Sequence, residues 1–143
     1  MTIQDTLQEL NKLFSIFEDP KEKFIQLMDM AKESEGLSES ERTEENKVYG
    51  CTSQAWVLMD KQEDRTFYFR TDSDAMIVKG LLTLLVKIFN GQTASEIRSV
   101  DGSVILNSIG LLGAVSNQRT NGFSSAVEKI PVSYTHLTLP TKA

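Results

Sequence analysis

The hydrophobic positions near the start of the chain repeat with the period of an α-helix. Apolar residues recur at alternating steps of four and three residues: Ile3, Leu7, Leu10, Phe14 and Phe17. This spacing places them on one helix face, and Thr2 followed by Asp5 is a helix start signal. The same spacing suits a coiled coil but lasts little more than two repeats, so we expect an amphipathic helix packed on the domain or on a partner.

A second helix is predicted to begin at Pro20, with Asp19 as its cap and Glu22 in its first turn. We expect its inward face to contain Phe24, Leu27, Met28 and Ala31. The segment 33–45 that follows contains six Glu and one Arg and offers almost nothing to bury. We therefore expect a solvated connector, with an acidic docking strip for a basic partner as the alternative.

The pattern changes in the middle of the chain from a helical period to a period of two. The runs 53–60 and 65–71 are rich in aromatic, β-branched and long apolar residues, and the polar residues 61–64 separate them. This arrangement predicts an antiparallel hairpin. In the second run, Phe67 and Phe69 share one face while Thr66, Tyr68 and Arg70 share the other. The first run has apolar residues on both faces, so we expect both to be largely covered.

Helical patterns return after Ser73, which is the expected cap of a strongly apolar helix ending at Asn90. Its near-continuous hydrophobicity predicts that this helix is the centre of the core. Thr93 with Glu96 predicts a further capped turn, and two more helices are expected, at residues 103–109 and after Ser116, the last one bearing Phe123, Val127 and Ile130.

The order of the predicted elements is helices, then a small antiparallel sheet, then helices again. This order indicates an α+β fold, a small antiparallel sheet flanked by helices, in one domain spanning residues 1–130. The segment 131–143 has no amphipathic period and begins with Pro131. We expect it to be a non-native or disordered tail, so His136 within it is not expected to take part in any mechanism.

Composition narrows the classes of function. The 143 residues include 15 Lys and Arg against 20 Asp and Glu, a net charge of −5, which disfavours binding to nucleic acid because that affinity rests on clustered basic residues. The longest apolar segment, 75–89, is too short for an ordinary membrane span and contains two Lys. No secretory signal starts the chain, so we expect a cytoplasmic protein without a membrane partner.

The counts of cysteine and histidine exclude several kinds of redox and metal site. With Cys51 and His136 as the single residues of their types, the chain cannot form an intramolecular disulfide, a CxxC redox pair or a four-cysteine metal cage. We expect no metal and no bound cofactor. Gly50 before the cysteine suits a tight exposed turn, whereas the alternative for Cys51 is a small buried apolar residue.

A lone thiol without a dependable base has few reactions open to it. Peroxide reduction needs an outside thiol, and acyl transfer needs a nearby base, but exchange with a second protein needs only a thiolate and access. A carrier that accepts sulfur on Cys51 fits this inventory best. The two alternatives are a regulator that docks on a sulfur donor without carrying sulfur, and a one-cysteine peroxidase.

Three stretches of the chain resemble the signature sequences of the SufE family in order and spacing: 50–56 (GCTSQAW), 73–80 (SDAMIVKG) and 116–122 (SNQRTNG). The resemblance extends over residues 14–130 and implies the SufE/IscU-like α+β fold, which the scaffold type of iron–sulfur protein shares. The chain departs from the family pattern at the second helix, where it has Pro20 in place of a common aromatic residue, and after it, where Met30-Ala31 and Ser34-Glu35 replace a Leu-Gly…Leu-Pro pattern. It also has Val-Ser-Asn before Arg119 where Leu-Thr-Pro is common.

The resemblance also implies a function. SufE-like proteins accept sulfur from a pyridoxal-phosphate-dependent cysteine desulfurase of the SufS type, stimulate it, and supply a scaffold complex of the SufBCD type for iron–sulfur cluster assembly. They hold neither the cluster nor pyridoxal phosphate, and they are carriers rather than enzymes on their own. By this likeness Cys51 is the persulfide acceptor.

The other motif residues have supporting or partner-docking roles by the same likeness. These residues are Gly50, Ser53, Gln54, Asp74 and Arg119. A cation at Arg119 favours the thiolate, while Asp74 either complements the positive end of the core helix or holds the cysteine loop. Trp56 is expected in the core, and Lys79 at the surface or with its charged end extended to solvent.

Overall fold

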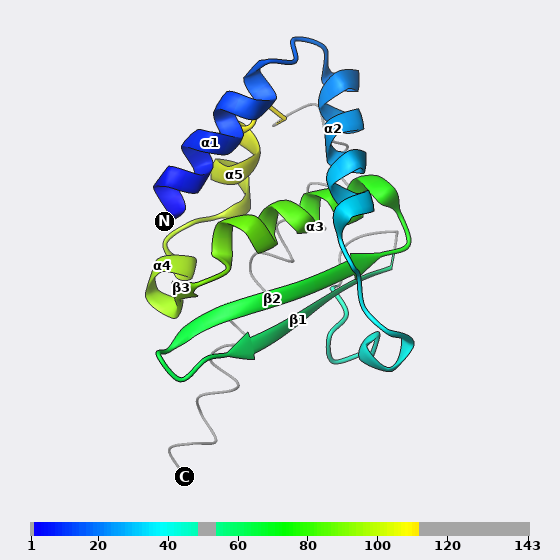
Figure 1. Ribbon diagram of the computed structural model, residues 1–143, viewed down its shortest axis with the longest axis vertical. Coiled ribbons are helices and arrows are strands. Elements are labelled where there is room, and N and C mark those ends of the chain that lie inside the picture. Colours follow the sequence, from blue (N-terminus) through cyan, green and yellow to red (C-terminus); the bar gives the residue numbers. More distant parts are fainter. Residues whose placement is uncertain (1, 49–53, 112–143) are drawn as a thin grey trace.

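The computed structural model describes residues 2–48 and 54–111. Its elements are α1 (Ile3–Ser15), α2 (Pro20–Glu33), the 3-10 turn η1 (Glu39–Glu41), β1 (Ala55–Lys61), β2 (Thr66–Ser73), α3 (Met76–Phe89), β3 (Gln92–Thr93), α4 (Ala94–Arg98) and α5 (Gly102–Ser108). The strands form one antiparallel sheet in the order β1-β2-β3. Figure 1 shows α3 between this sheet and the helices α1 and α2, which confirms the predicted α+β fold.

Side-chain caps start the first two helices where the sequence predicts them. The Thr2 hydroxyl accepts a hydrogen bond from the Asp5 N–H (3.1 Å), and the Asp5 carboxylate accepts one from the Thr2 N–H (3.2 Å). Asp19 accepts a hydrogen bond from the Lys21 N–H (3.0 Å), with Pro20 in the first position of α2. The prediction for Phe17 was wrong, because α1 ends at Ser15 and Phe17 is only partly buried.

The inward face of α2 is set by its close contact with α3. A Cβ atom placed on Gly80 of α3 would lie 2.3 Å from the carbonyl oxygen of Leu27, so the two backbones nearly touch there. The stripe facing α3 therefore contains Leu27, Met30 and Ala31, all buried. The prediction was wrong for Met28, which is only partly buried. Phe24 is partly buried too, but it packs against the core as predicted.

The hairpin has the predicted faces. In β2, Phe67 and Phe69 are buried against α3, whereas Tyr68 and Arg70 are exposed. β1 pairs with β2 along its whole length, from Ala55 opposite Ser73 to Lys61 opposite Phe67. The two-residue strand β3, which pairs with the start of β2, was not predicted because two residues show no period.

The core helix α3 is confirmed, but its predicted cap is wrong. Ser73 is the last residue of β2, and the residue that precedes the helix as its cap is Ala75, which makes no side-chain capping bond. Pairing with Ala55 keeps Ser73 extended. Its hydroxyl donates to the Gln54 carbonyl oxygen (2.7 Å) and accepts from the Ala75 N–H (3.2 Å) instead.

Two short helices follow the sheet. Thr93 and Glu96 form the predicted capping box of α4, and Asp101 caps α5, which starts one residue before the predicted range. The last predicted helix after Ser116 and the tail 131–143 lie outside the described residues. Within residues 2–48 and 54–111, none of the helices combines the length and hydropathy needed to cross a membrane.

Candidate functional site

Cys51 lies between two described stretches of chain that are hydrogen-bonded to each other. The Val48 N–H donates to the Ala55 carbonyl oxygen (2.8 Å), and the Val57 N–H donates to the Asn46 carbonyl oxygen (2.8 Å). Residues 46–48 thus run antiparallel to the start of β1. The five residues that join these two stretches along the chain are 49–53, with Cys51 in the middle.

Four of the predicted site residues are outside the described part of the chain. Gly50, Cys51 and Ser53 belong to the segment 49–53, and Arg119 belongs to the segment 112–143. We call residues 49–53 the cysteine segment. The structure describes the residues to which this segment is attached, 46–48 before it and 54–57 after it, and we call these its frame.

The other two predicted site residues, Gln54 and Asp74, are brought together. The Gln54 N–H donates to Asp74 Oδ1 (3.1 Å), and the Asp74 N–H donates to the Gln54 carbonyl oxygen (3.1 Å). Gln54 directly follows the cysteine segment, and Asp74 lies in the turn between β2 and α3. Of the two roles considered for Asp74, this contact favours holding the end of the cysteine segment.

Asp72, a carboxylate only 2% exposed, is a site residue that the sequence pattern did not predict. Its Oδ2 accepts hydrogen bonds from Arg42 Nη2 (2.6 Å) and the Leu37 N–H (3.0 Å). Its Oδ1 accepts one from the Ser73 N–H (2.8 Å) and lies 3.5 Å from Lys79 Nζ. Leu37 and Arg42 belong to the acidic connector, and Lys79 belongs to α3. Asp72 therefore links the connector and α3 to β2.

Two opposing effects act on the pKa of Asp72. Burial of the carboxyl by itself raises this pKa, since it disfavours the charged form. The hydrogen bonds from the Leu37 N–H, Arg42 and the Ser73 N–H, together with the charge of Lys79, outweigh burial and hold the pKa below its ordinary value. Asp72 is therefore ionised at neutral pH and acts as a fixed negative charge.

The acidic connector is mostly exposed, as predicted, but it is also attached to the sheet. Leu37 is buried, and the Arg42 guanidinium lies 5.3 Å from the centroid of the buried Trp56 ring. Gly36 has φ +68°, and a Cβ there would lie 2.7 Å from Asp72 Oδ2. The carboxylate of Asp72 therefore determines the path of residues 36–42.

Lys79 also differs from its prediction. Its side chain is 19% exposed, and its charge lies against Asp72 rather than in solvent. No pattern in the sequence indicated that Asp72 is buried. Its burial, once known, calls for a basic partner, and Arg42 is the single basic residue of the acidic connector.

No metal site is present in the part of the chain that the structure describes. Within this part, no three side chains of His, Cys, Asp or Glu come together in an arrangement that could hold an ion.

Comparison with known families and proteins gives a consistent result. The model of the SufE family, described as an Fe-S metabolism associated domain, matches residues 8–133. A SufE-like protein of Rhizobium etli, named as uncharacterized, is 35% identical over 128 residues, which is 87% of this chain and 86% of the relative. SufE-like protein 1 of Arabidopsis thaliana, named as chloroplastic/mitochondrial, is 38% identical over 133 residues, 92% of this chain but 35% of that protein.

A further relative and a solved structure extend this result. An uncharacterized SufE-like protein of Synechocystis is 34% identical over 122 residues, 85% of this chain and 76% of the relative. The solution structure of a hypothetical protein from Thermus thermophilus has a TM-score of 0.71 and 17% identity, covering 89% of this chain and 91% of its own, and shows the same fold. The chain therefore belongs to the SufE family and, through that domain, to iron–sulfur metabolism.

Proposed function

We propose that this protein is a sulfur carrier that accepts persulfide sulfur on Cys51. The donor is a pyridoxal-phosphate-dependent cysteine desulfurase of the SufS type, which the carrier stimulates by removing its product. The acceptor is a scaffold complex of the SufBCD type, which uses the sulfur for iron–sulfur cluster assembly. The protein acts only in partnership, and the pyridoxal phosphate belongs to the desulfurase.

The transfer step is a thiol–persulfide exchange. The Cys51 thiolate attacks the outer sulfur of the donor persulfide, and a new sulfur–sulfur bond forms on Cys51 while the bond between the two donor sulfurs breaks. The donor cysteine leaves as a thiolate. No outside oxidant or reductant is needed, because the persulfide is only moved from one cysteine to the other.

The observation that carries this proposal is the anchored frame on both sides of the single cysteine. Val48 is bonded to Ala55 on one side, and Gln54 is bonded to Asp74 on the other. A short segment held at both ends presents its middle residue to a partner at a small cost in conformational entropy. This supports a thiol that another protein reaches, and it is what sulfur exchange requires.

The remaining site residues receive supporting roles in the same proposal. Gly50 permits the turn at the cysteine, while Ser53 and Gln54 support the segment behind it. Asp74 holds Gln54 by its carboxylate, and Arg119 stabilises the thiolate and contacts the docked desulfurase. We also propose that the protein works in the cytoplasm, where a lone cysteine stays reduced.

Stimulation of a SufS-type desulfurase tests this proposal against its first alternative. The rate of cysteine desulfuration is measured with the wild-type protein and with Cys51→Ser, which keeps the size of the side chain but removes the thiol. We expect the wild-type protein to raise the rate and Cys51→Ser to lose that stimulation while still binding the desulfurase. Equal stimulation by both proteins would mean that the protein regulates the desulfurase without carrying sulfur.

A further inference from the structure

The register of the frame decides where the cysteine segment begins and ends. Two backbone hydrogen bonds set this register, from the Val48 N–H to the Ala55 carbonyl oxygen and from the Val57 N–H to the Asn46 carbonyl oxygen. A shift by one residue would turn the side chains of residues 46–48 to the other face and change the length of chain between the paired positions. A ladder this short is marginal by itself, so contacts outside it have to support its register.

The chain that enters the frame is a turn bonded to itself. The Asn46 side-chain amide donates to the Glu41 carbonyl oxygen (2.9 Å). The Asn46 N–H donates to the Thr43 carbonyl oxygen (3.2 Å). Because these bonds close residues 41–46 into a loop, the place of its first residues determines the place of Asn46, where the frame begins.

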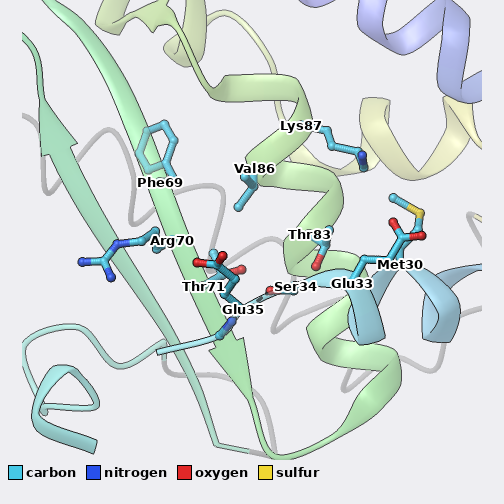
Figure 2. A pocket seen from close by; sticks show the side chains of 11 residues that line it. Met30, Glu33, Ser34, Glu35, Phe69, Arg70, Thr71, Thr83, Val86 and Lys87 are labelled. Carbon is cyan, nitrogen blue, oxygen red and sulfur yellow. Dashed lines mark hydrogen bonds between the residues drawn. The ribbon is translucent and has the colours of Figure 1, made fainter. Parts of the chain in front are cut away.

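The first two residues of this loop are attached to β2. Arg70 Nη1 donates to Glu41 Oε1 (3.2 Å), and Arg42 Nη2 donates to Asp72 Oδ2 (2.6 Å). Arg70 and Asp72 are two residues apart in the strand, so their side chains leave it on the same face. Figure 2 shows the guanidinium of Arg70 directed away from Val86 of α3. The loop is therefore fastened at two successive positions to the strand that pairs with β1.

Arg42 differs from Arg70 because it contacts both strands of the hairpin. Its guanidinium lies 5.3 Å from the centroid of the Trp56 ring, and Trp56 is directly opposite Asp72 in the register of β1 and β2. Lys47 of the frame pairs with the same Trp56. Arg42 thus lies at the point where the frame meets the hairpin. A planar guanidinium can bond a carboxylate with its edge while its face lies over an aromatic ring, which an ammonium group cannot do.

Neutralising the buried Asp72 does not by itself require Arg42. Lys79 and the N–H groups of Leu37 and Ser73 also face this carboxylate. The side chain of Arg42 is 43% exposed, so its charge is not forced out of water by the packing of the core. A buried ion pair adds little net stability over apolar residues of the same volume, and its best-attested use is to specify one register. Both points favour a positioning role for Arg42.

We propose that Arg42 is a positioning residue for sulfur transfer. It fixes the register of the frame, and through the frame it holds Cys51 where the outer sulfur of the donor persulfide reaches it. Arg42 takes no part in the exchange of sulfur itself and acts through residues 46–48. This inference rests on the sulfur-carrier proposal, because it assigns Arg42 to the step in which the Cys51 thiolate attacks.

Arg42→Met tests this inference because it removes the guanidinium and keeps an apolar stem. In the protein alone, we expect hydrogen exchange at the Val48 and Val57 amides to be faster by about tenfold. With a SufS-type desulfurase, cysteine and a reductant, we expect the kcat of the stimulated reaction to fall by about tenfold while the KM for the carrier stays within about twofold. A misplaced thiol slows the transfer, whereas docking is retained.

Two further variants separate positioning from stability and from charge. Ile105→Val in α5, which Figure 1 shows on the other side of α3 from the sheet, trims the core away from the frame. We expect it to lower the melting temperature and to leave kcat unchanged. Arg42→Lys keeps a charge beside Asp72 without the planar group over Trp56. We expect its melting temperature to be near that of the wild-type protein, and its kcat to be as low as that of Arg42→Met.

Four results would overturn the inference: unchanged exchange at Val48 and Val57 in Arg42→Met, an unchanged kcat in that variant, an equal loss of kcat in Ile105→Val, or full recovery of kcat in Arg42→Lys. Failure of the sulfur-carrier proposal is distinguishable, since it would show as no sulfur on Cys51 of the wild-type protein. The exchange measurement needs no desulfurase, so it decides whether Arg42 fixes the frame in either case.

Discussion

Two contacts hold other segments against α3 and the sheet, and they are made of different interactions. Where α2 meets α3, the backbones nearly touch at Gly80 and the buried side chains are apolar, with Leu27 at the centre. Where the connector meets β2, the buried Asp72 carboxylate is bonded to Arg42 and to the Leu37 N–H. The first contact depends on shape, and the second depends on charge.

The difference matters because the cysteine segment is attached at the polar contact. Asp74, which holds Gln54, follows Asp72 by two residues, and Trp56 lies opposite Asp72 in the sheet. A shape-dependent contact is insensitive to pH, whereas a contact made by a carboxylate weakens when the carboxylate is protonated. The frame of the site should therefore respond to pH while the helical core does not.

The largest effect is expected from Asp72→Asn. The amide keeps the size of the carboxylate but removes its charge, which leaves Arg42 and Lys79 without their counter-charge. Breaking a buried ion pair in this way should lower the free energy of unfolding by about 3 kcal/mol, measured by urea denaturation. Asp60→Asn is the matched control on the exposed edge of β1. A loss no larger than that of the control would contradict the role given to Asp72.

Gly80→Ala tests the shape-dependent contact. The added methyl group would have to push α3 away from the Leu27 carbonyl oxygen, so we expect the free energy of unfolding to fall by about 2 kcal/mol. Lys87→Ala in the same helix is exposed, and its effect should stay within about 0.5 kcal/mol. If Gly80→Ala were as harmless as this control, the close approach of α2 and α3 would not be essential to the fold.

The losses of stability in Asp72→Asn and Gly80→Ala should differ in their pH dependence, and this difference tests whether the first contact depends on shape and the second on charge. The pKa of Asp72 is lower in the folded state than its ordinary value of 3.8, so its ionised form stabilises the fold fully above the ordinary value. This stabilisation is lost as pH falls through the lower folded-state pKa. Urea curves between about pH 7 and pH 3 should show the deficit of Asp72→Asn shrinking at the acidic end while that of Gly80→Ala stays constant. A deficit of Asp72→Asn that is constant over this range would show that its charge is not the cause.

The smallest and most local effect is expected from Asp74→Ala. Asp74 is exposed, and the variant removes the carboxylate that accepts the Gln54 N–H. We expect little change in global stability but faster hydrogen exchange at the Gln54 amide. The Val48 and Val57 amides, which bond to backbone carbonyls, serve as internal controls and should not change. Unchanged exchange at Gln54 would remove Asp74 from the frame of the cysteine segment.

Local signals in the sequence were sufficient for much of the fold. The caps at Thr2, Asp19 and Thr93 act within three residues, and the alternation in β2 correctly separated Phe67 and Phe69 from their exposed neighbours. Ser73 misled the prediction because a serine before an apolar run is a typical cap, while strand pairing with a residue 18 positions earlier determined its conformation.

The site was predictable only in part, for a related reason. The single thiol at Cys51 and the motif around it were visible in the sequence, and Gln54 and Asp74 were named as motif residues, but the contact between these two was not predicted. The role of Asp72 was not visible, since Leu37 and Arg42 lie 35 and 30 residues away from it along the chain. A buried ion pair is a tertiary interaction, and neither period nor spacing predicts it.

The most direct test of the central claim is the intact mass of the protein after mixing with a SufS-type desulfurase and free cysteine. The sulfur-carrier proposal predicts a gain of one sulfur atom on Cys51 that a reductant removes, and no gain in Cys51→Ser. An unchanged mass of the wild-type protein, with the desulfurase shown to be active, would contradict it.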